Sequence, residues 1–86
     1  MSQLNLRLAR AVRALRSEAG FSQEAFAAKV KIHRTFMSLI ERGKTNVSVE
    51  TLERLAEGLN MSVWQLIRRA EAGTDLYGKV AEDRLP

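Results

Sequence analysis

Apolar residues recur at helical spacing along the first part of the chain. Five of them lie three or four positions apart: Leu4, Leu8, Val12, Leu15 and Ala19. Arginines recur at every third position between them: Arg7, Arg10, Arg13 and Arg16. This pattern predicts an amphipathic helix, and Gly20 is a typical residue at which such a helix ends.

Two shorter helical patterns follow this first helix. Ser22 is a suitable N-cap for a helix over "QEAFAAKV", residues 23 to 30, and Glu24 favours its first turn. Its inward residues are Phe26, Ala27 and Val30. The pattern breaks at Lys31 and Ile32. A third helix then begins at His33 or Arg34 and stops at Gly43, and its apolar residues are Phe36, Met37 and Ile40.

Two more helices are predicted in the second half of the chain. Ser48 caps a fourth helix over "VETLERLAEGL", whose inward residues are Leu52, Leu55, Ala56 and Leu59. Ser62 and Gln65 have capping-box spacing, and a fifth helix then presents Val63, Leu66 and Ile67, with Trp64 nearby. Five helices and no strand predict an all-α domain over residues 1–72. The periodicity fades beyond Gly73, so residues 73–86 are expected to form a tail, flexible or ordered by a partner.

Length and composition restrict this domain further. A chain of 86 residues fits one small domain, and the absence of cysteine excludes disulfides and thiolate metal sites. No apolar run approaches the roughly 18 residues that cross a bilayer. The Arg-rich start also has the properties of a transit peptide, but it runs directly into a globular-looking continuation. We therefore expect a cytoplasmic protein, associated with the nucleoid and not with a membrane.

Charge is distributed unevenly along the chain. Residues 1–47 hold nine Lys or Arg against three Asp or Glu, which gives 9 − 3 = +6, whereas residues 48–86 hold five against seven, which gives 5 − 7 = −2. Such a distribution favours a basic face that meets a polyanion, with the acidic half turned away.

One face of the third helix has the chemistry of major-groove recognition. On a helical wheel five residues share about 140° of its circumference, apart from the apolar side: Arg34, Thr35, Ser38, Leu39 and Arg42. Arginine donates two hydrogen bonds to guanine, small hydroxyls serve bases or phosphates, and an aliphatic group packs on the thymine methyl. An ordinary solvated face is the alternative. The preceding helix and three-residue turn favour DNA, because together they make a helix-turn-helix.

The segment "SQEAFAAKVKIHRTFMSLIERGKTNVSVETLERLAEGLNMSVWQLI", residues 22 to 67, resembles the lambda-repressor-like helix-turn-helix family. The resemblance rests on Gln23, Ala27, Ile32, Met37 and Ile40, then on "ERGK" and "SVETLERLA". Within this family "HRTFMS" is most similar to controller proteins of restriction–modification systems. Similar short regulators occur in phages, mobile elements and antitoxins. The resemblance implies a five-helix DNA-binding domain.

The outer face of the third helix, the loop after it and the resemblance together predict roles for particular residues. Base contacts fall to Arg34, Thr35 and Ser38, with Leu39 or His33 assisting. Phosphate contacts fall to Gln23, Arg42, Lys44, Thr45 and Asn46, of which Gln23 presents the N-terminus of its helix to the anion. Arg16 matches the position that pairs with Glu41, so this pair is expected to join helices.

Lys31 stands where the family commonly has glycine. A positive φ there costs on the order of 1 kcal/mol and is expected to loosen or reshape the turn.

Other chemistries receive little support from the sequence. His33, the only histidine, excludes a multi-histidine metal site, and a DNA contact and a capping role are equally open for it. "GKT" at residues 43–45 lacks the earlier glycine of a phosphate-binding loop, because Ser38 stands there. No nucleophile–base arrangement, paired carboxylates or metal spacing indicates an enzyme. We therefore expect no cofactor.

Several apolar residues near the end of the chain exceed what a small monomer usually exposes: Trp64, Ile67, Leu76 and Tyr77. They predict a twofold contact, unless Trp64 closes the monomer core. The sequence thus favours a homodimeric regulator that binds double-stranded DNA at a palindromic operator. The alternative is a protein-interaction adaptor or an antitoxin on the same fold. Such an adaptor would use the C-terminal tail or the arginine stripe of the first helix to hold a protein partner or an anionic membrane.

Overall fold

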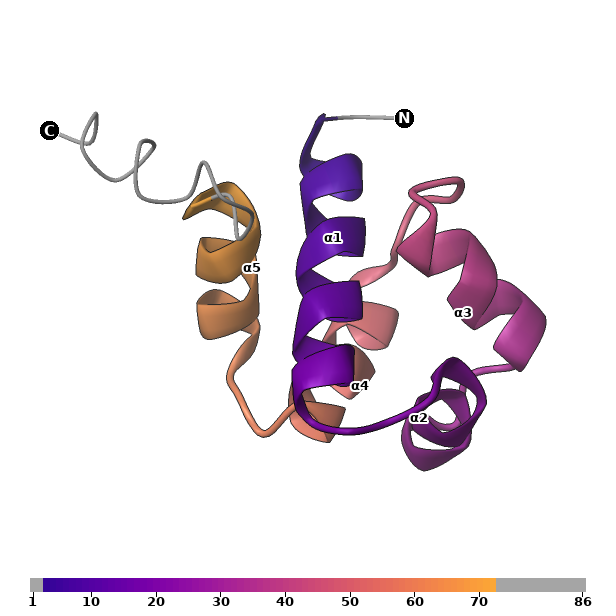
Figure 1. The fold of residues 1–86 in the computed structure, drawn as a ribbon. Coiled ribbons are helices and arrows are strands. Elements are labelled where there is room, and N and C mark those ends of the chain that lie inside the picture. Colours follow the sequence, from indigo (N-terminus) through magenta and orange to yellow (C-terminus); the bar gives the residue numbers. More distant parts are fainter. Residues whose placement is uncertain (1–2, 73–86) are drawn as a thin grey trace, which may run out of the picture.

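The computed structural model describes residues 3–72, which contain the five predicted helices (Figure 1). They are α1 (Gln3–Glu18), α2 (Gln23–Val30), α3 (Arg34–Glu41), α4 (Val49–Gly58) and α5 (Val63–Ala72). No strand occurs in this part of the chain, so the all-α prediction is confirmed. None of these five helices has the length and apolar content needed to cross a bilayer. The predicted tail, with Leu76 and Tyr77, lies outside the described residues.

Three serines begin helices as predicted. The Oγ atoms of Ser22 and Ser48 accept from the backbone N–H groups of Ala25 and Thr51, at 3.0 and 3.1 Å. Ser62 and Gln65 form the full capping box, with bonds of 2.8 and 3.0 Å in the two directions. These side chains satisfy backbone donors that the first helical turn leaves unpaired, so the helix starts are set by local sequence.

Four helices end on a residue with positive φ: Gly20, Lys31, Gly43 and Asn60. In all four cases the next residue donates its N–H to the carbonyl five positions back, as Ile32 does to the Ala27 carbonyl at 2.9 Å. Lys31 adopts φ 60° and ψ 43°, so the turn keeps the left-handed geometry that glycine usually supplies. The expectation that Lys31 would reshape this turn was wrong. The buried Ile32 and a bond from Arg54 to the Lys31 carbonyl hold the turn in place.

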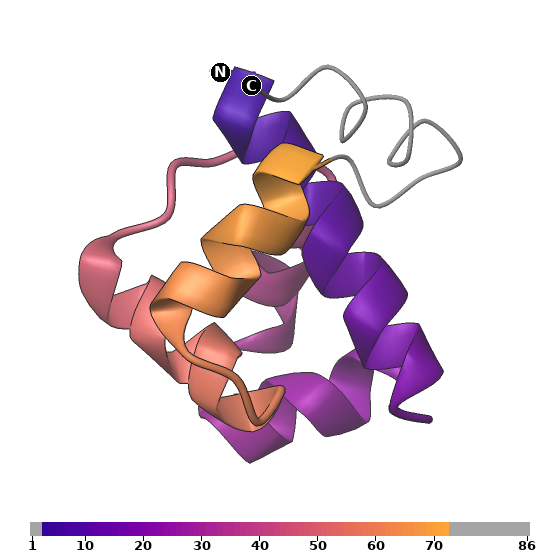
Figure 2. The same cartoon turned by 90° about the vertical axis from the view of Figure 1, so that its left-hand side faces the viewer.

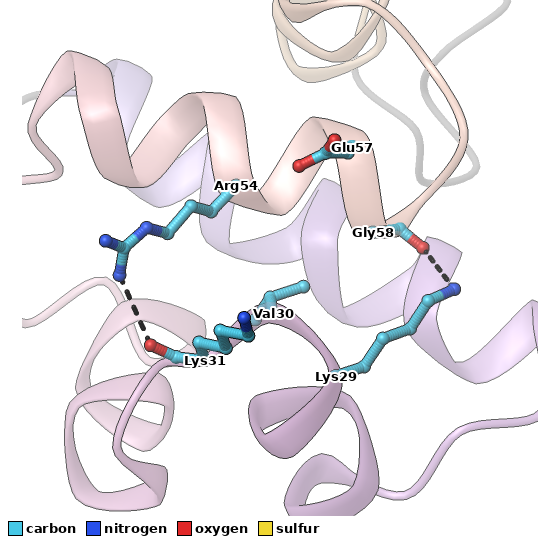
Figure 3. Close-up of a pocket in the computed structure, with 6 residues that line it drawn as sticks. All are labelled: Lys29, Val30, Lys31, Arg54, Glu57 and Gly58. Carbon is cyan, nitrogen blue, oxygen red and sulfur yellow. Dashed lines mark hydrogen bonds between the residues drawn. The ribbon is translucent and has the colours of Figure 1, made fainter.

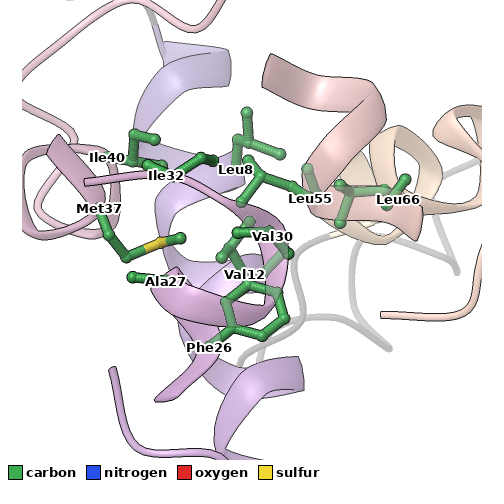
Figure 4. Packing of buried hydrophobic residues seen from close by; sticks show 13 residues of the cluster. Leu8, Val12, Phe26, Ala27, Val30, Ile32, Met37, Ile40, Leu55 and Leu66 are labelled. Carbon is green, nitrogen blue, oxygen red and sulfur yellow. The ribbon is translucent and has the colours of Figure 1, made fainter. Parts of the chain in front are cut away.

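Side chains from all five helices meet in one core (Figure 4). Its largest fully buried members are Val12 of α1, Phe26 of α2, Met37 and Ile40 of α3, Leu55 of α4 and Leu66 of α5. Helix α1 runs through the middle, with α5 on one side and α3 on the other (Figures 1 and 2). The far side of α3 from this core is consequently left open.

Two sequence-based expectations about burial need correction, and one alternative is excluded. Leu4 is 39% exposed, and Ala19 is exposed beyond the end of α1. The inward stripe of α1 instead includes the buried Ala9 and Ala11. Trp64 is 65% exposed on α5, so it does not close the core of the monomer.

Candidate nucleic-acid interface

Helices α2 and α3 form the predicted helix-turn-helix through the three residues 31–33. Ala27 of α2 is buried in the same cluster as Met37 and Ile40 of α3, and both α3 residues are at most 2% exposed. This apolar contact fixes the side of α3 that faces inward. Arg34, Thr35 and Arg42 are consequently exposed on the other side.

A groove of about 280 Å³ lies between the first turn of α2 and the outer face of α3. It is lined by polar and charged residues: Gln23, Glu24, Arg34, Thr35, Ser38 and Arg42. The structure therefore brings together three predicted base-contacting residues and two predicted phosphate-contacting residues. It adds Glu24, for which the sequence indicated only a role in helix formation.

The buried carboxylate of Glu41, on α3, is bonded to side chains of α1 and α2. Arg16 donates from Nε to Glu41 Oε2 at 2.7 Å and from NH2 to Oε1 at 3.0 Å, which is a bidentate ion pair. A third hydrogen bond to Glu41 comes from Gln23, whose Nε2 donates to Oε1 at 3.0 Å. The Glu41 side chain is only 2% exposed. The predicted Arg16–Glu41 pair is thus present, and it also fixes the amide of Gln23.

Glu24 and Arg34 face each other at the opposite edge of the groove. Arg34 NH1 donates to Glu24 Oε2, and both side chains are 68% exposed. The predicted guanine-reading group is therefore positioned by an acid of the neighbouring helix. A pair so exposed contributes little to stability, because water screens it.

His33 caps α3, since its Nδ1 accepts from the Thr35 N–H at 3.1 Å. In the neutral imidazole the proton is then on Nε2, and the residue is exposed. Leu39 is half-buried, and the groove is lined by other residues. Base contacts by His33 and Leu39 stay predictions.

The loop after α3 carries the remaining predicted phosphate contacts. Lys44 and Asn46 are exposed, and Thr45 is half-buried. Asn46 Oδ1 accepts from Asn5 Nδ2 of α1 at 2.6 Å. Next to it, Leu6 packs against Gly43, where an added Cβ would come 2.7 Å from Leu6 Cδ2. The start of α1 thus holds a loop that projects beyond the end of α3 (Figure 1).

The sequence model of the helix-turn-helix domain family matches residues 7–66, the span of these elements. The chain belongs to the helix-turn-helix domain family. The control protein C.MunI of Mycoplasma sp is 38% identical over 72 residues, which are 83% of this chain and 97% of that protein. The control protein C.SmaI of Serratia marcescens is 42% identical over 62 residues, 72% of this chain and 74% of that protein.

A solved structure of the restriction–modification controller protein C.Esp1396I has the same fold. It was determined as a tetramer in complex with its natural operator of 35 base pairs. It superposes with a TM-score of 0.72 at 31% identity, over 81% of this chain and 97% of that chain. The resemblance to controller proteins, which the sequence suggested, is therefore confirmed.

A second groove of the helix-turn-helix domain, about 360 Å³, lies between the end of α2 and α4 (Figure 3). Two of its three cationic residues, Lys29 and Arg54, use their side chains in bonds within the protein. Lys29 Nζ donates to the Gly58 carbonyl at 2.9 Å, and Arg54 NH1 donates to the Lys31 carbonyl at 3.2 Å. These bonds satisfy helix-terminal carbonyls, so the groove supports the turn between α2 and α3.

Glu24 and Asn5 are the residues that sequence reasoning missed at this helix-turn-helix site. Their partners, Arg34 and Asn46, lie 10 and 41 positions away. Opposite charges at the start of α2 and the start of α3 were a usable indication for Glu24. Nothing in the local pattern indicated the Asn5–Asn46 bond.

Proposed function

We propose that this protein is a sequence-specific regulator of transcription that binds double-stranded DNA with α3 in the major groove. The observation that carries the proposal is the polar groove, in which Arg34, Thr35 and Ser38 share one open surface. The similarity of the chain to controller proteins of restriction–modification systems supports the same function.

Each group in the groove has a role that its chemistry supports. Arg34 reads guanine through O6 and N7, and the hydroxyls of Thr35 and Ser38 bond to neighbouring base edges or phosphates. Gln23 contacts a phosphate at the start of α2, where free backbone amides favour an anion. Arg42 and the loop residues Lys44, Thr45 and Asn46 contact the DNA backbone and set the register of α3.

The protein acts as a homodimer, because one reading helix contacts too few base pairs to select a site in a genome. Trp64, at 65% exposed, and the half-buried Ile67 support a twofold contact through α5. This helix lies on the other side of α1 from α3 (Figure 1), away from the residues that line the groove. Two copies would place their α3 helices about 34 Å apart, one turn of a palindromic operator.

The proposal is tested by measuring fluorescence anisotropy on duplexes selected from a randomised library. Arg34→Ala should cost about 1–3 kcal/mol on the best duplex and relax the preference at one guanine in each half-site. Lys44→Ala should weaken all duplexes alike, because a phosphate contact carries no base preference. Arg13→Ala, which removes an exposed arginine outside the groove, is the control.

Two results would contradict the DNA-reading role. If no library duplex is preferred over random sequence, the protein is not a sequence-specific regulator, and an adaptor role on this fold becomes the better explanation. If Arg34→Ala weakens every duplex equally, Arg34 is a phosphate contact and another residue reads the base.

The dimer is tested separately by sedimentation. Trp64→Ala should shift the mass toward monomer and weaken palindromic duplexes far more than an isolated half-site. Val49→Ala is the matched control, since Val49 is 72% exposed on α4 and should leave the mass unchanged. If the Trp64→Ala protein stays dimeric, the dimer interface does not depend on Trp64 and lies elsewhere.

A further inference from the structure

The groove contains one acidic side chain that is not buried, and its position is unusual for a surface that meets phosphates. Of the residues that line it, Glu24 is an exposed carboxylate, and Arg34 and Arg42 are exposed cations. The other nearby acid, Glu41, is buried and bonded to Arg16 and Gln23. Glu24 thus brings a negative charge to the place where DNA is expected.

We infer that Glu24 is a specificity-determining residue, which positions the Arg34 guanidinium and lowers the affinity for arbitrary DNA more than for the operator. The inference rests on the proposed DNA-reading function of the groove. It concerns a residue that the base and phosphate contacts above do not include.

The geometry of the pair leaves Arg34 able to read a base. A guanidinium has five N–H donors, and the NH1 nitrogen of Arg34 donates to Glu24 Oε2. A guanine edge requires two donors, for O6 and N7. Arg34 can therefore contact guanine without releasing Glu24, and the carboxylate restricts the guanidinium to fewer orientations.

A phosphate in the same place meets a different environment. The acceptors of guanine are neutral, whereas phosphate oxygens carry negative charge that the Glu24 carboxylate repels. Arg34 must then leave Glu24 or hold two anions close together. Glu24 accordingly penalises the non-specific mode, in which arginines bind only phosphates, more than the mode in which Arg34 reaches a base.

The test compares Glu24→Gln with the unmodified protein on two probes, the best duplex from the randomised library and a scrambled duplex of equal length. On the scrambled duplex the affinity should rise about fivefold, the effect of two unit charges about 4 Å apart in water. The slope of log K against log salt should steepen by about 0.9, because Arg34 neutralises one more phosphate. The affinity for the selected duplex should rise less, so the ratio of the affinity for the selected duplex to that for the scrambled duplex falls.

Two matched variants separate this effect from general charge and from folding. Glu57→Gln makes the same charge change on α4, outside the groove, and should shift both duplexes equally. Glu50→Gln is the control for folding, because Glu50 resembles Glu24 in two respects. It is the second residue of a helix after a serine cap, and it is paired with an arginine, Arg54. Thermal unfolding of Glu24→Gln should match that of Glu50→Gln. In an Arg34→Ala background, Glu24→Gln should no longer change the specificity ratio.

The outcomes are distinguishable. An equal change on both duplexes, like that of Glu57→Gln, overturns the inference and leaves the proposed function standing. Loss of preference at one cytosine with no gain on the scrambled duplex overturns it as well, because Glu24 would then accept directly from the cytosine amino group. If the unmodified protein prefers neither duplex, the proposed function fails and the inference fails with it.

Discussion

Removal of Arg16 should be among the most destabilising single substitutions in this domain. The Glu41 side chain, 2% exposed, accepts three hydrogen bonds, two from Arg16 and one from Gln23. Arg16→Ala removes two of them together with the neutralising charge. The carboxylate is then left buried with one neutral donor.

The magnitude follows from this geometry. Breaking a buried ion pair from one side costs about 3–5 kcal/mol, because the remaining charge is not compensated. Proteins have a free energy of unfolding of roughly 0.05–0.15 kcal/mol per residue, so a domain of this size has about 4–13 kcal/mol in total. Glu41→Ala should cost less, about 1.5–3 kcal/mol. Arg16 is 13% exposed and keeps its 2.7 Å bond to the Phe21 carbonyl, so it retains a partner and some access to water.

A double-mutant cycle tests the argument by urea unfolding followed by far-UV circular dichroism at one protein concentration. The double variant should cost about 1–3 kcal/mol less than the sum of the two single changes, with similar m-values throughout. Arg13→Ala, an exposed arginine on the same helix, should stay within about 0.5 kcal/mol of the unmodified protein. Additivity within about 0.5 kcal/mol, or an Arg16→Ala effect no larger than that of Arg13→Ala, would refute the reasoning.

Three further substitutions can be measured in the same urea titration. Lys31→Gly should raise the free energy of unfolding by up to about 1 kcal/mol, because glycine adopts φ 60° without strain; a lower value would contradict this account of the turn. Ser48→Ala should lower it by about 1 kcal/mol through loss of the bond to the Thr51 N–H, and no change would mean that the cap is replaceable. Gly58→Ala should lower it by about 1–3 kcal/mol, because the added Cβ overlaps Val30 Cγ1; unchanged stability would show that α2 can move away.

The fold was largely predictable because its determinants are local. Serine caps at Ser22, Ser48 and Ser62 act within three residues of themselves, so the sequence alone locates these helix starts. Leu4 and Ala19 were placed wrongly for a different reason. Periodicity defines the apolar side of α1, but the neighbouring helices determine how much of its length they cover, and no local pattern carries that information.

The candidate site was predictable only in part. The outer residues of α3 follow from helical periodicity, whereas the Arg16–Glu41 pair was expected only from family resemblance. Gln23 was expected at a phosphate and is also bonded to Glu41, which periodicity cannot indicate. The pairing of Glu24 with Arg34 depends on the angle at which α2 crosses α3, and that angle is set by packing in the core.

The carboxylate of Glu41 joins three helices at one point, because its partners Arg16 and Gln23 belong to α1 and α2. A shift of α3 against α2 large enough to follow a DNA major groove of a different width would break at least one of these bonds. We therefore expect the domain to approach DNA as a rigid body. Operators that differ in groove width must then adapt by bending the duplex, which is easiest at flexible pyrimidine–purine steps. Base pairs that no side chain touches would thereby influence which operator is bound most tightly.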